Sequence, residues 1–393
     1  MITLQRHVIG ALVRHFQLTP GALGAPFYGP LPDAGYAAQV AQWYESLPPA
    51  SRLSPEAFAV LAAPDLVSDV RVFQGRGSLT RTWAMARFGE KPGPFLLAAP
   101  QGENGDLKIE VLDSSDAFSD TLLTWLIGGS EPSEPELNVR LTQPECAILL
   151  ALADLYSRDA FSSYIAHRPV EDRYSQELIA RAYHEAVTVD DPRWLLSFAL
   201  PLLDDGVAHL DGGAIAQALQ GLHRRGLIEP AGQDWKFTIP GEYAALSFHR
   251  RTVTVAVDTV AADVDGRLGT HAALLLRSDE PLWFMNLPVE GEAALTGISL
   301  QAARDILDAL FTPLAKAPLQ RPPAPQTAAA PPPPPGPPAP PPYSAAPAPP
   351  YAAQPPYAGA PYAAPPAGGI CPACGQPVVA GAVFCGNCGA RIG

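Results

Sequence analysis

Cysteine is nearly absent from most of this chain. Of its 393 residues five are cysteines, and four of them lie in the last 23, which read CPACGQPVVAGAVFCGNCGARIG. Long apolar runs are absent too. The most apolar stretches, 147–155 and 194–203, are shorter than the roughly 20 residues that a membrane-spanning helix needs. We therefore expect no membrane span.

The N-terminal sequence, MITLQRHVIGALVRHFQL, interleaves arginine and histidine with its apolar residues. This pattern breaks the continuous apolar segment that a signal peptide requires, and it favours an amphipathic helix. The expected compartment is the cytoplasm, where thiols stay reduced.

Positive charge is scarce. The chain has 26 Lys and Arg against 39 Asp and Glu, which makes the formal net charge −13. A protein this acidic has no general attraction for nucleic acid or for an anionic membrane surface. We expect protein partners, which the sequence does not identify, and no nucleic-acid partner.

Proline is abundant but segregated. Residues 317–369 consist largely of proline, alanine and tyrosine, and no Asp, Glu, Lys or Arg occurs between Pro322 and Ala390. Such a segment cannot bury enough apolar surface to offset its ordering entropy, so it predicts a disordered, extended linker. Its recurring PPY and PY sequences leave open a second role as a ligand for aromatic-lined grooves.

The four clustered cysteines, Cys371, Cys374, Cys385 and Cys388, follow the pattern C-x2-C, ten residues, C-x2-C. Two such pairs supply the four thiolates of a closed tetrahedral Zn²⁺ site, which is structural rather than catalytic. Two disulfides or a redox C-x-x-C are the alternatives. A reducing compartment and the lack of a strand–helix unit around either pair disfavour both.

This tail resembles the short zinc-ribbon modules of many prokaryotic proteins, which share the pattern C-P-x-C-G … F-C-x-x-C-G. The resemblance implies the same four zinc ligands, with Phe384 packed against them. The ribbon carries Arg391 as its one cation, whereas ribbons that bind nucleic acid present several to the phosphates. We therefore expect the module to face protein.

Two stretches of the remaining sequence resemble each other. Residues 52–126 and 237–311 both read as a helix, three or four antiparallel strands and a closing amphipathic helix. The segments GSLTRTWAMARF and GRLGTHAALLLR correspond, as do PFLLAAP and PLWFMNLP. The predicted fold class is α+β, with a pseudo-twofold repeat of antiparallel sheet plus helices.

An all-helical segment, residues 141–236, separates the two copies. Its end, GGAIAQALQGLHRRGLIEPAGQDWKFTI, resembles a winged helix, with Leu219, Leu222 and Leu227 facing inward. The exposed side chains of its third helix should include Gln217, Gln220, His223, Arg224 and Arg225. Acidic residues precede this helix, so we favour protein contact and keep DNA contact as the alternative.

The sequence therefore predicts five regions. They are an N-terminal α+β half (1–140), a winged-helix-like insert (141–236), a second α+β repeat (237–316), a disordered linker (317–369) and a zinc ribbon (370–393).

The first copy raises a second family resemblance. The helix LSPEAFAVLAAP, the strand VRV and the hairpins in GSLTRTWAMARFGEKPGPFLLAA are similar to the EspG-type chaperones of type VII secretion. That resemblance implies a quasi-twofold α+β protein that binds a helical secreted partner. The helical insert, linker and ribbon depart from the family pattern, and no motif residue carries over.

None of the common catalytic motifs occurs. Cys146 lies among apolar residues with no basic neighbour in sequence, which favours a small buried side chain over a nucleophile. We therefore predict a non-enzymatic adaptor with a tethered zinc ribbon. The alternatives are an EspG-like chaperone and a winged-helix protein associated with transcription.

Overall fold

The computed structural model describes residues 1–312, except for short gaps at 29–30, 76, 89–92, 103–104, 129–130, 134, 171, 263–267 and 289–290. It also describes the backbone of two short strands near the C-terminus, β14 (Ala367–Ile370) and β15 (Pro377–Val379). The chain divides into two compact units, Met1–Pro325 and Gln326–Gly393. Residues 317–366 of the predicted linker and all four predicted zinc ligands lie outside the described residues.

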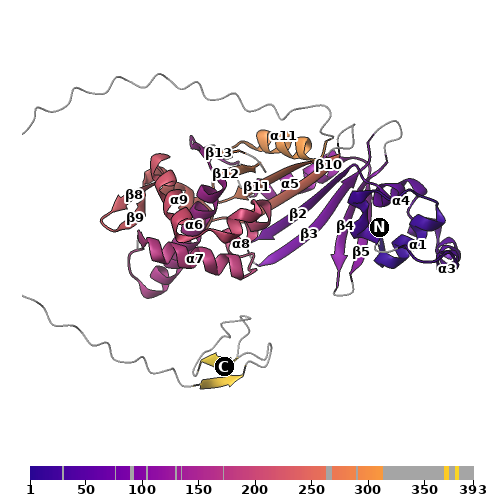
Figure 1. Ribbon diagram of the computed structural model, residues 1–393, viewed down its shortest axis with the longest axis horizontal. Helices are drawn as coiled ribbons and strands as arrows, with labels where there is room; N and C mark the ends of the chain where they lie inside the picture. Colours follow the sequence, from indigo (N-terminus) through magenta and orange to yellow (C-terminus); the bar gives the residue numbers. More distant parts are fainter. Residues whose placement is uncertain are drawn as a thin grey trace, which may run out of the picture. The chain divides into compact units, whose positions relative to one another are not determined.

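A ten-stranded antiparallel sheet forms the centre of the first unit (Figure 1). Its strand order is β1-β5-β4-β3-β2-β10-β11-β12-β13-β6. The strands are β1 (Ile2–Leu4), β2 (Leu66–Gln74), β3 (Ser78–Ala86), β4 (Phe95–Gln101), β5 (Asp106–Leu112), β6 (Asn138–Leu141), β10 (Val253–Ala262), β11 (Leu268–Arg277), β12 (Leu282–Leu287) and β13 (Ala293–Gly297).

The predicted repeat is present. From the centre of the sheet outward, the first half has the strands β2, β3, β4, β5 and β1, and the second half has the corresponding strands β10, β11, β12, β13 and β6. In the first half α4 (Pro55–Ala62) precedes β2–β5 and α5 (Ser115–Ile127) follows them. In the second half α10 (Ile239–His249) precedes β10–β13 and α11 (Leu300–Leu310) follows them. The two halves join where β2 pairs with β10. The observed architecture is therefore the α+β pseudo-twofold sheet that the sequence predicts.

The repeat also extends beyond the segments that the sequence comparison matched. Each half starts with an edge strand and a group of helices: β1 lies beside β5, and β6 lies beside β13. The helical segment between the two matched copies thus takes the place that the N-terminal helices hold in the first half. These helices are α1 (Arg6–His15), α2 (Ala25–Tyr28), α3 (Ala34–Ser46), α6 (Gln143–Ala166), α7 (Gln176–Thr188), α8 (Leu195–Ala199) and α9 (Gly212–Arg224), with 3₁₀ turns at Ala22–Gly24, Pro49–Ser51, Leu200–Leu202 and Asp205–His209.

The second helical group has the topology of a winged helix. Along the chain come α6, β7 (Arg173–Ser175), α7, α8, α9, β8 (Ile228–Ala231) and β9 (Asp234–Phe237). The three strands pair in the order β7-β9-β8, so the segment is not all-helical, in contrast to the expectation from the sequence. Leu219, Leu222 and Leu227 are fully buried, as predicted. A capping box starts α6: the Thr142 hydroxyl accepts from the Glu145 N–H, and the Glu145 carboxylate accepts from the Thr142 N–H.

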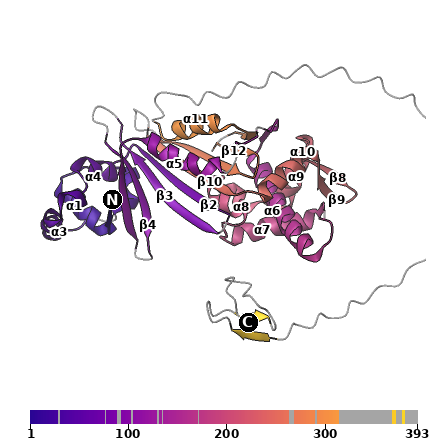
Figure 2. The ribbon, with the colours of Figure 1, turned by 180° about the vertical axis from the view of Figure 1, so that it is seen from behind.

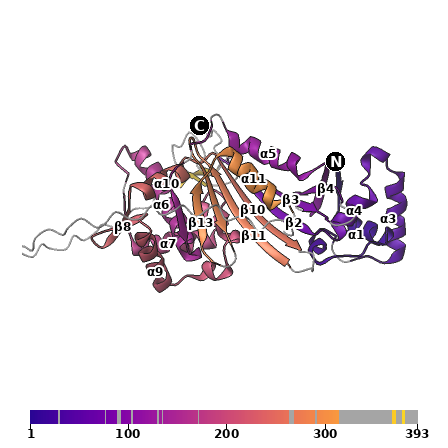
Figure 3. The same ribbon diagram turned by 90° about the horizontal axis from the view of Figure 1, so that it is seen from above.

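Two layers of helices cover the sheet unevenly. Helices α5 and α11 lie side by side on one face, over a core that includes Val70, Val72, Val255 and Val257 (Figures 1 and 3). On the other face the N-terminal helices pack on one end and the winged-helix group packs on the other, each with its own core. Figure 2 shows these two helical groups at opposite ends of the sheet, with β2 and β3 running between them.

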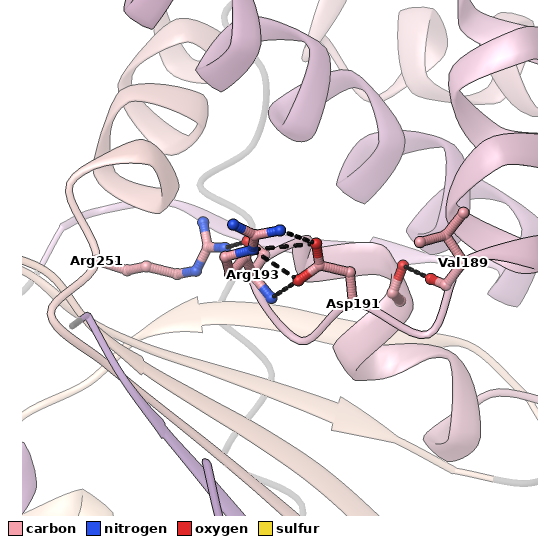
Figure 4. A network of polar contacts seen from close by, with 5 residues as sticks. Val189, Asp191, Arg193 and Arg251 are labelled. Atoms are coloured by element: carbon pink, nitrogen blue, oxygen red, sulfur yellow. Dashed lines mark hydrogen bonds and ion pairs between the residues drawn. The ribbon is translucent and has the colours of Figure 1, made fainter. Parts of the chain in front are cut away.

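A polar network joins the winged-helix group to the sheet. The Asp154 carboxylate accepts the N–H groups of Leu195 (2.9 Å) and Leu196 (3.0 Å) at the start of α8. Two residues before β10, Arg251 donates to the Phe248 carbonyl (2.8 Å) and to the Arg193 carbonyl. Asp191 holds the Arg193 guanidinium in turn, and the Val189 carbonyl accepts from Ser197 (Figure 4). These bonds fix the loop before α8 against the entry to the central strand.

The first prediction concerns the pH dependence of stability. Burial raises the pKa of Asp154 to about 6, whereas an unfolded chain has a value of about 3.9. Because the fold binds this proton more tightly than the unfolded chain, the contribution of Asp154 stabilises the protein as pH falls. Between pH 7 and 5 it should raise the free energy of unfolding by about 1 kcal/mol.

Urea unfolding at several pH values measures this effect, with Asp154→Asn as the reference that cannot titrate. The difference between the two curves should grow by this amount as the pH falls from 7 to 5. A difference that does not change with pH contradicts the raised pKa.

The second prediction tests a close backbone approach. A Cβ on Gly241 of α10 would lie 1.9 Å from the Leu227 carbonyl oxygen, whereas a Cβ on Gly212 of α9 meets nothing within 4 Å. Both glycines lie in the first turn of a helix. Gly241→Ala should lower the free energy of unfolding by about 2 kcal/mol through overpacking. Gly212→Ala should leave it unchanged or raise it slightly. Equal effects in denaturant unfolding would show that the α10 contact is not tight.

Candidate protein-binding groove and zinc module

The middle of one sheet face carries charged side chains and no covering helix. Side chains that point to the same face alternate along a strand, and on β2 this face reads Val67, Asp69, Arg71 and Phe73. Val67 packs on the core of the N-terminal helices, and Phe73 belongs to the core of the winged-helix group. The two charged residues between them are only partly buried. The face is thus apolar at both ends, where helices cover it, and polar at its centre, which we call the central groove.

A cavity of about 380 Å³ opens in this groove beside the N-terminal helices. That volume lies within the range of sites that hold small ligands or side chains. The rings of Phe27 and Trp83 meet edge to face in its wall, with centroids 5.7 Å apart. The lining residues are Arg6, Ala22, Leu23, Pro26, Phe27, Val67, Asp69, Arg81, Trp83, Asp258 and Val260.

One ion pair on the groove floor is complete. The Arg81 guanidinium binds Asp69 through two parallel hydrogen bonds, from Nε to Oδ1 and from Nη2 to Oδ2, each 2.9 Å long. Its carbon Cζ lies 4.9 Å from the centroid of the Trp83 ring. The pair and the stacked ring hold this arginine in place, although half of its side chain is exposed.

The carboxylate next to that pair is free. Asp258 of β10 lies directly opposite Asp69 of β2 in the strand register. No hydrogen bond or ion pair joins its carboxylate to any residue in the described part of the chain. Partial burial, and then the like charge of Asp69, raises the pKa of Asp258 above its usual value, and the charge of Arg71 offsets only part of this effect. The groove therefore contains a carboxylate that gains from a cationic partner.

A second charge lies deeper toward the winged-helix group. The Arg71 guanidinium lies 5.5 Å from the centre of the Phe198 ring. Its Nε is buried and has no hydrogen-bond partner among the residues that the structure describes. Burial lowers the pKa of Arg71 below its usual value. Arg71 does not line the cavity, so the cavity and the Arg71 site are neighbouring features of one groove.

The local sequence pattern does not mark these groove residues as a site. A signal was present, since Asp69 and Arg71 interrupt the apolar pattern of a strand that is otherwise half buried. The pairing of β2 with β10, however, joins residues almost 190 positions apart, and no local pattern reports it.

The surface of α9 has little free positive charge. Gln217, Gln220, His223, Arg224 and Arg225 are exposed, as predicted. The Arg225 guanidinium, however, binds Glu292 (2.6 Å) and lies 3.6 Å from the Glu145 carboxylate. Exposed acidic residues precede the helix, at Asp204, Asp205 and Asp211. On this surface, Arg224 is therefore the cation that forms no ion pair with any described residue.

The zinc module is described through its two strands. β14 pairs antiparallel with β15, and the segment that joins them contains Cys371 and Cys374. Four thiolates in two C-x2-C pairs are a donor set that suits Zn²⁺. In the part of the chain with described side chains, no group of three or more His, Cys, Asp or Glu residues is placed to hold a metal ion. Cys146 is fully buried, and burial raises the pKa of its thiol, as expected for an inert side chain.

Comparisons with known proteins gave matches of two kinds. Residues 370–392 match the family model described as a zinc-ribbon domain. The chain is also similar to a solved structure, that of the Mycobacterium tuberculosis type VII secretion system chaperone EspG5 in complex with the PE25–PPE41 dimer. The match has 12% identity and a TM-score of 0.39, and it covers 80% of this chain and 98% of that one. No curated protein matches. None of the helices described is long and apolar enough to cross a bilayer.

The third prediction concerns the metal. We expect the purified full-length protein to contain one zinc per chain, bound by Cys371, Cys374, Cys385 and Cys388. Replacing Cys371 and Cys374 together by serine should remove it, because two thiolates cannot close a tetrahedral site. Cys146→Ala is the matched control and should keep the metal. Elemental analysis after dialysis measures the ratio, and zinc retention in the double variant would exclude this ligand set.

Proposed function

We propose that this protein is a non-enzymatic adaptor that binds a partner polypeptide in the central groove. The observation that carries the proposal is the uncovered sheet face between two helical groups. Elsewhere the sheet buries its apolar side chains under helices, and here it presents charged ones. Among these, the buried Nε of Arg71 has no hydrogen-bond partner in the described part of the chain. A buried polar group without a hydrogen-bond partner calls for an explanation, and a binding partner supplies one here.

Exposed apolar side chains on the same face support a polypeptide partner. Leu79 of β3 is 49% exposed, and Leu268 of β11 is 58% exposed. In the strand registers Leu79 pairs with Phe73, and Leu268 pairs with Ala262. Both therefore point to the groove side of the sheet. Apolar contacts around a few oriented charges are the usual composition of a protein interface.

The zinc module supplies a second point of contact in this proposal. A long proline-rich segment joins the groove to the module. Because the two are tethered, a protein bound in the groove and a protein bound by the zinc module are held near each other at a raised effective concentration. We place this activity in the cytoplasm, where reduced cysteines are available to bind zinc. The narrower form of the proposal is a chaperone that holds a helical secreted partner in the groove.

We propose protein contact for the α9 surface as well. The ion pairs of Arg225 neutralise the cation at its C-terminal end, and the acidic residues before its first turn repel phosphate. Electrostatic binding to DNA needs several free lysine or arginine side chains.

The fourth prediction uses a photo-crosslinking phenylalanine analogue at single positions of the full-length protein. Leu79 and Leu268 lie on the groove side of the sheet, near its two ends, whereas Ile127, 45% exposed on α5, lies on the opposite side of the sheet and serves as the control. Irradiation in the native cells should give a crosslinked partner at both groove positions, with a yield at least about tenfold above that at Ile127.

A blocking variant completes this test. Thr270 is exposed on the groove side of β11, and Thr121 is exposed on α5. Thr270→Trp should reduce crosslinking at Leu268, two residues away on the same face of β11, at least about tenfold by blocking this part of the face, whereas Thr121→Trp should not. Equal yields at the groove and control positions, or an unaffected yield in Thr270→Trp, contradict the proposed function.

A further inference from the structure

The free carboxylate in the cavity indicates what kind of side chain the groove accepts. Resting on the proposed function, we infer that the partner inserts a basic side chain, the guanidinium of an arginine or the ammonium of a lysine, that pairs with Asp258. The inference deepens the proposal by naming the chemistry of the partner at one point of the groove.

The charges around Asp258 leave it without a direct partner, because the charge of Arg71 acts on it but forms no hydrogen bond or ion pair with it. Both carboxylate oxygens of Asp69, its neighbour on β2, are already bound by Arg81. On its other side, on β11, the register partner is Ala272, which offers only a methyl group. A cation that enters the cavity therefore meets one free carboxylate beside a neutralised ion pair.

The arginines of this chain do not take that place. Arg81 is held by Asp69 and stacks on Trp83, and Arg71 lies over Phe198 outside the cavity lining. Arg6 lines the cavity but is exposed, and it forms no ion pair with any residue described. Arg6 could therefore pair with an acidic residue of the partner that lies next to the inserted basic residue.

The walls of the cavity suit a long side chain better than a metal ion. Leu23, Pro26, Phe27, Val67 and Val260 present apolar surface on the way to Asp258. The methylene stem of an arginine or lysine packs on such surface while its charged end reaches a polar group. Divalent cations require several oxygen ligands, whereas Asp258 is the one free carboxylate in this lining. Charge complementarity therefore selects a basic side chain of a polypeptide.

The fifth prediction uses a peptide probe and the full-length protein. The peptide Ac-Leu-Ala-Arg-Ala-Leu-NH2 is compared with the same peptide carrying citrulline, a neutral isostere of arginine. The protein is labelled with 5-fluorotryptophan, and Trp83→Phe identifies the fluorine signal of Trp83. The arginine peptide should shift this signal saturably, and the citrulline peptide should bind at least about tenfold more weakly, because it loses the charge-assisted pair.

Two variants assign the effect to Asp258. Asp258→Asn should bind both peptides equally and at least about tenfold more weakly than the unaltered protein binds the arginine peptide. Asp116→Asn, which removes an exposed charge from the first turn of α5, should change nothing. Equal binding of the two peptides by the unaltered protein overturns the inference, and that comparison stands even if Asp258→Asn folds poorly.

Crosslinking in the two variants Thr270→Trp and Asp258→Asn distinguishes failure of this inference from failure of the proposed function. If Thr270→Trp abolishes crosslinking at Leu268 and Asp258→Asn leaves it intact, the groove binds a partner but not through a basic side chain at this point. If neither substitution affects crosslinking, both proposals are wrong.

Discussion

The antiparallel pairing of β2 with β10 is the interaction on which the rest of the structure depends. It joins two similar halves, and across it the buried hydroxyls of Ser68 and Thr259 lie 2.8 Å apart. The two halves are related by a pseudo-twofold axis. A helical group that covers one end of a sheet face therefore has a counterpart that covers the other end of the same face. Helices α5 and α11 meet on one side of the sheet, whereas the two large helical groups on the other side stand apart.

The groove follows from that separation. The strands β2 and β10 are about ten residues long, and each helical group covers only the part of the face nearest to it. At the uncovered centre, water can solvate the charged side chains of Asp69 and Asp258, so they cost less there than they would under a helix. Arg71 instead lies against Phe198 of α8. Partial burial still makes each of them sensitive to a partner. The separation of the two helical groups therefore leaves the floor of the groove uncovered and also makes this floor suited to binding.

The winged-helix group packs against the sheet and presents little free positive charge for DNA. Its long helix α6 is buried along most of its length, and Gly221 of α9 allows that helix to approach Glu145 closely. Arg225, near the end of α9, binds carboxylates of its own chain. A cation that already has two such partners at 2.6 and 3.6 Å contributes little to phosphate binding. The motif here packs against the sheet through α6 and α10 and joins it through Arg251.

The sequence alone determined the features that depend on local pattern. Cysteine spacing predicted the zinc-ribbon tail, and apolar periodicity predicted the repeat and its α+β class. The segment GGAIAQALQGLHRRGLIEPAGQDWKFTI predicted the winged helix, with Leu219 and Leu222 expected to face inward. Only the tertiary structure decided which strands meet at the centre of the sheet, and so which charges face each other. Asp69 and Asp258 lie far apart in the chain, and their contact depends on register and packing, which arise from the whole fold.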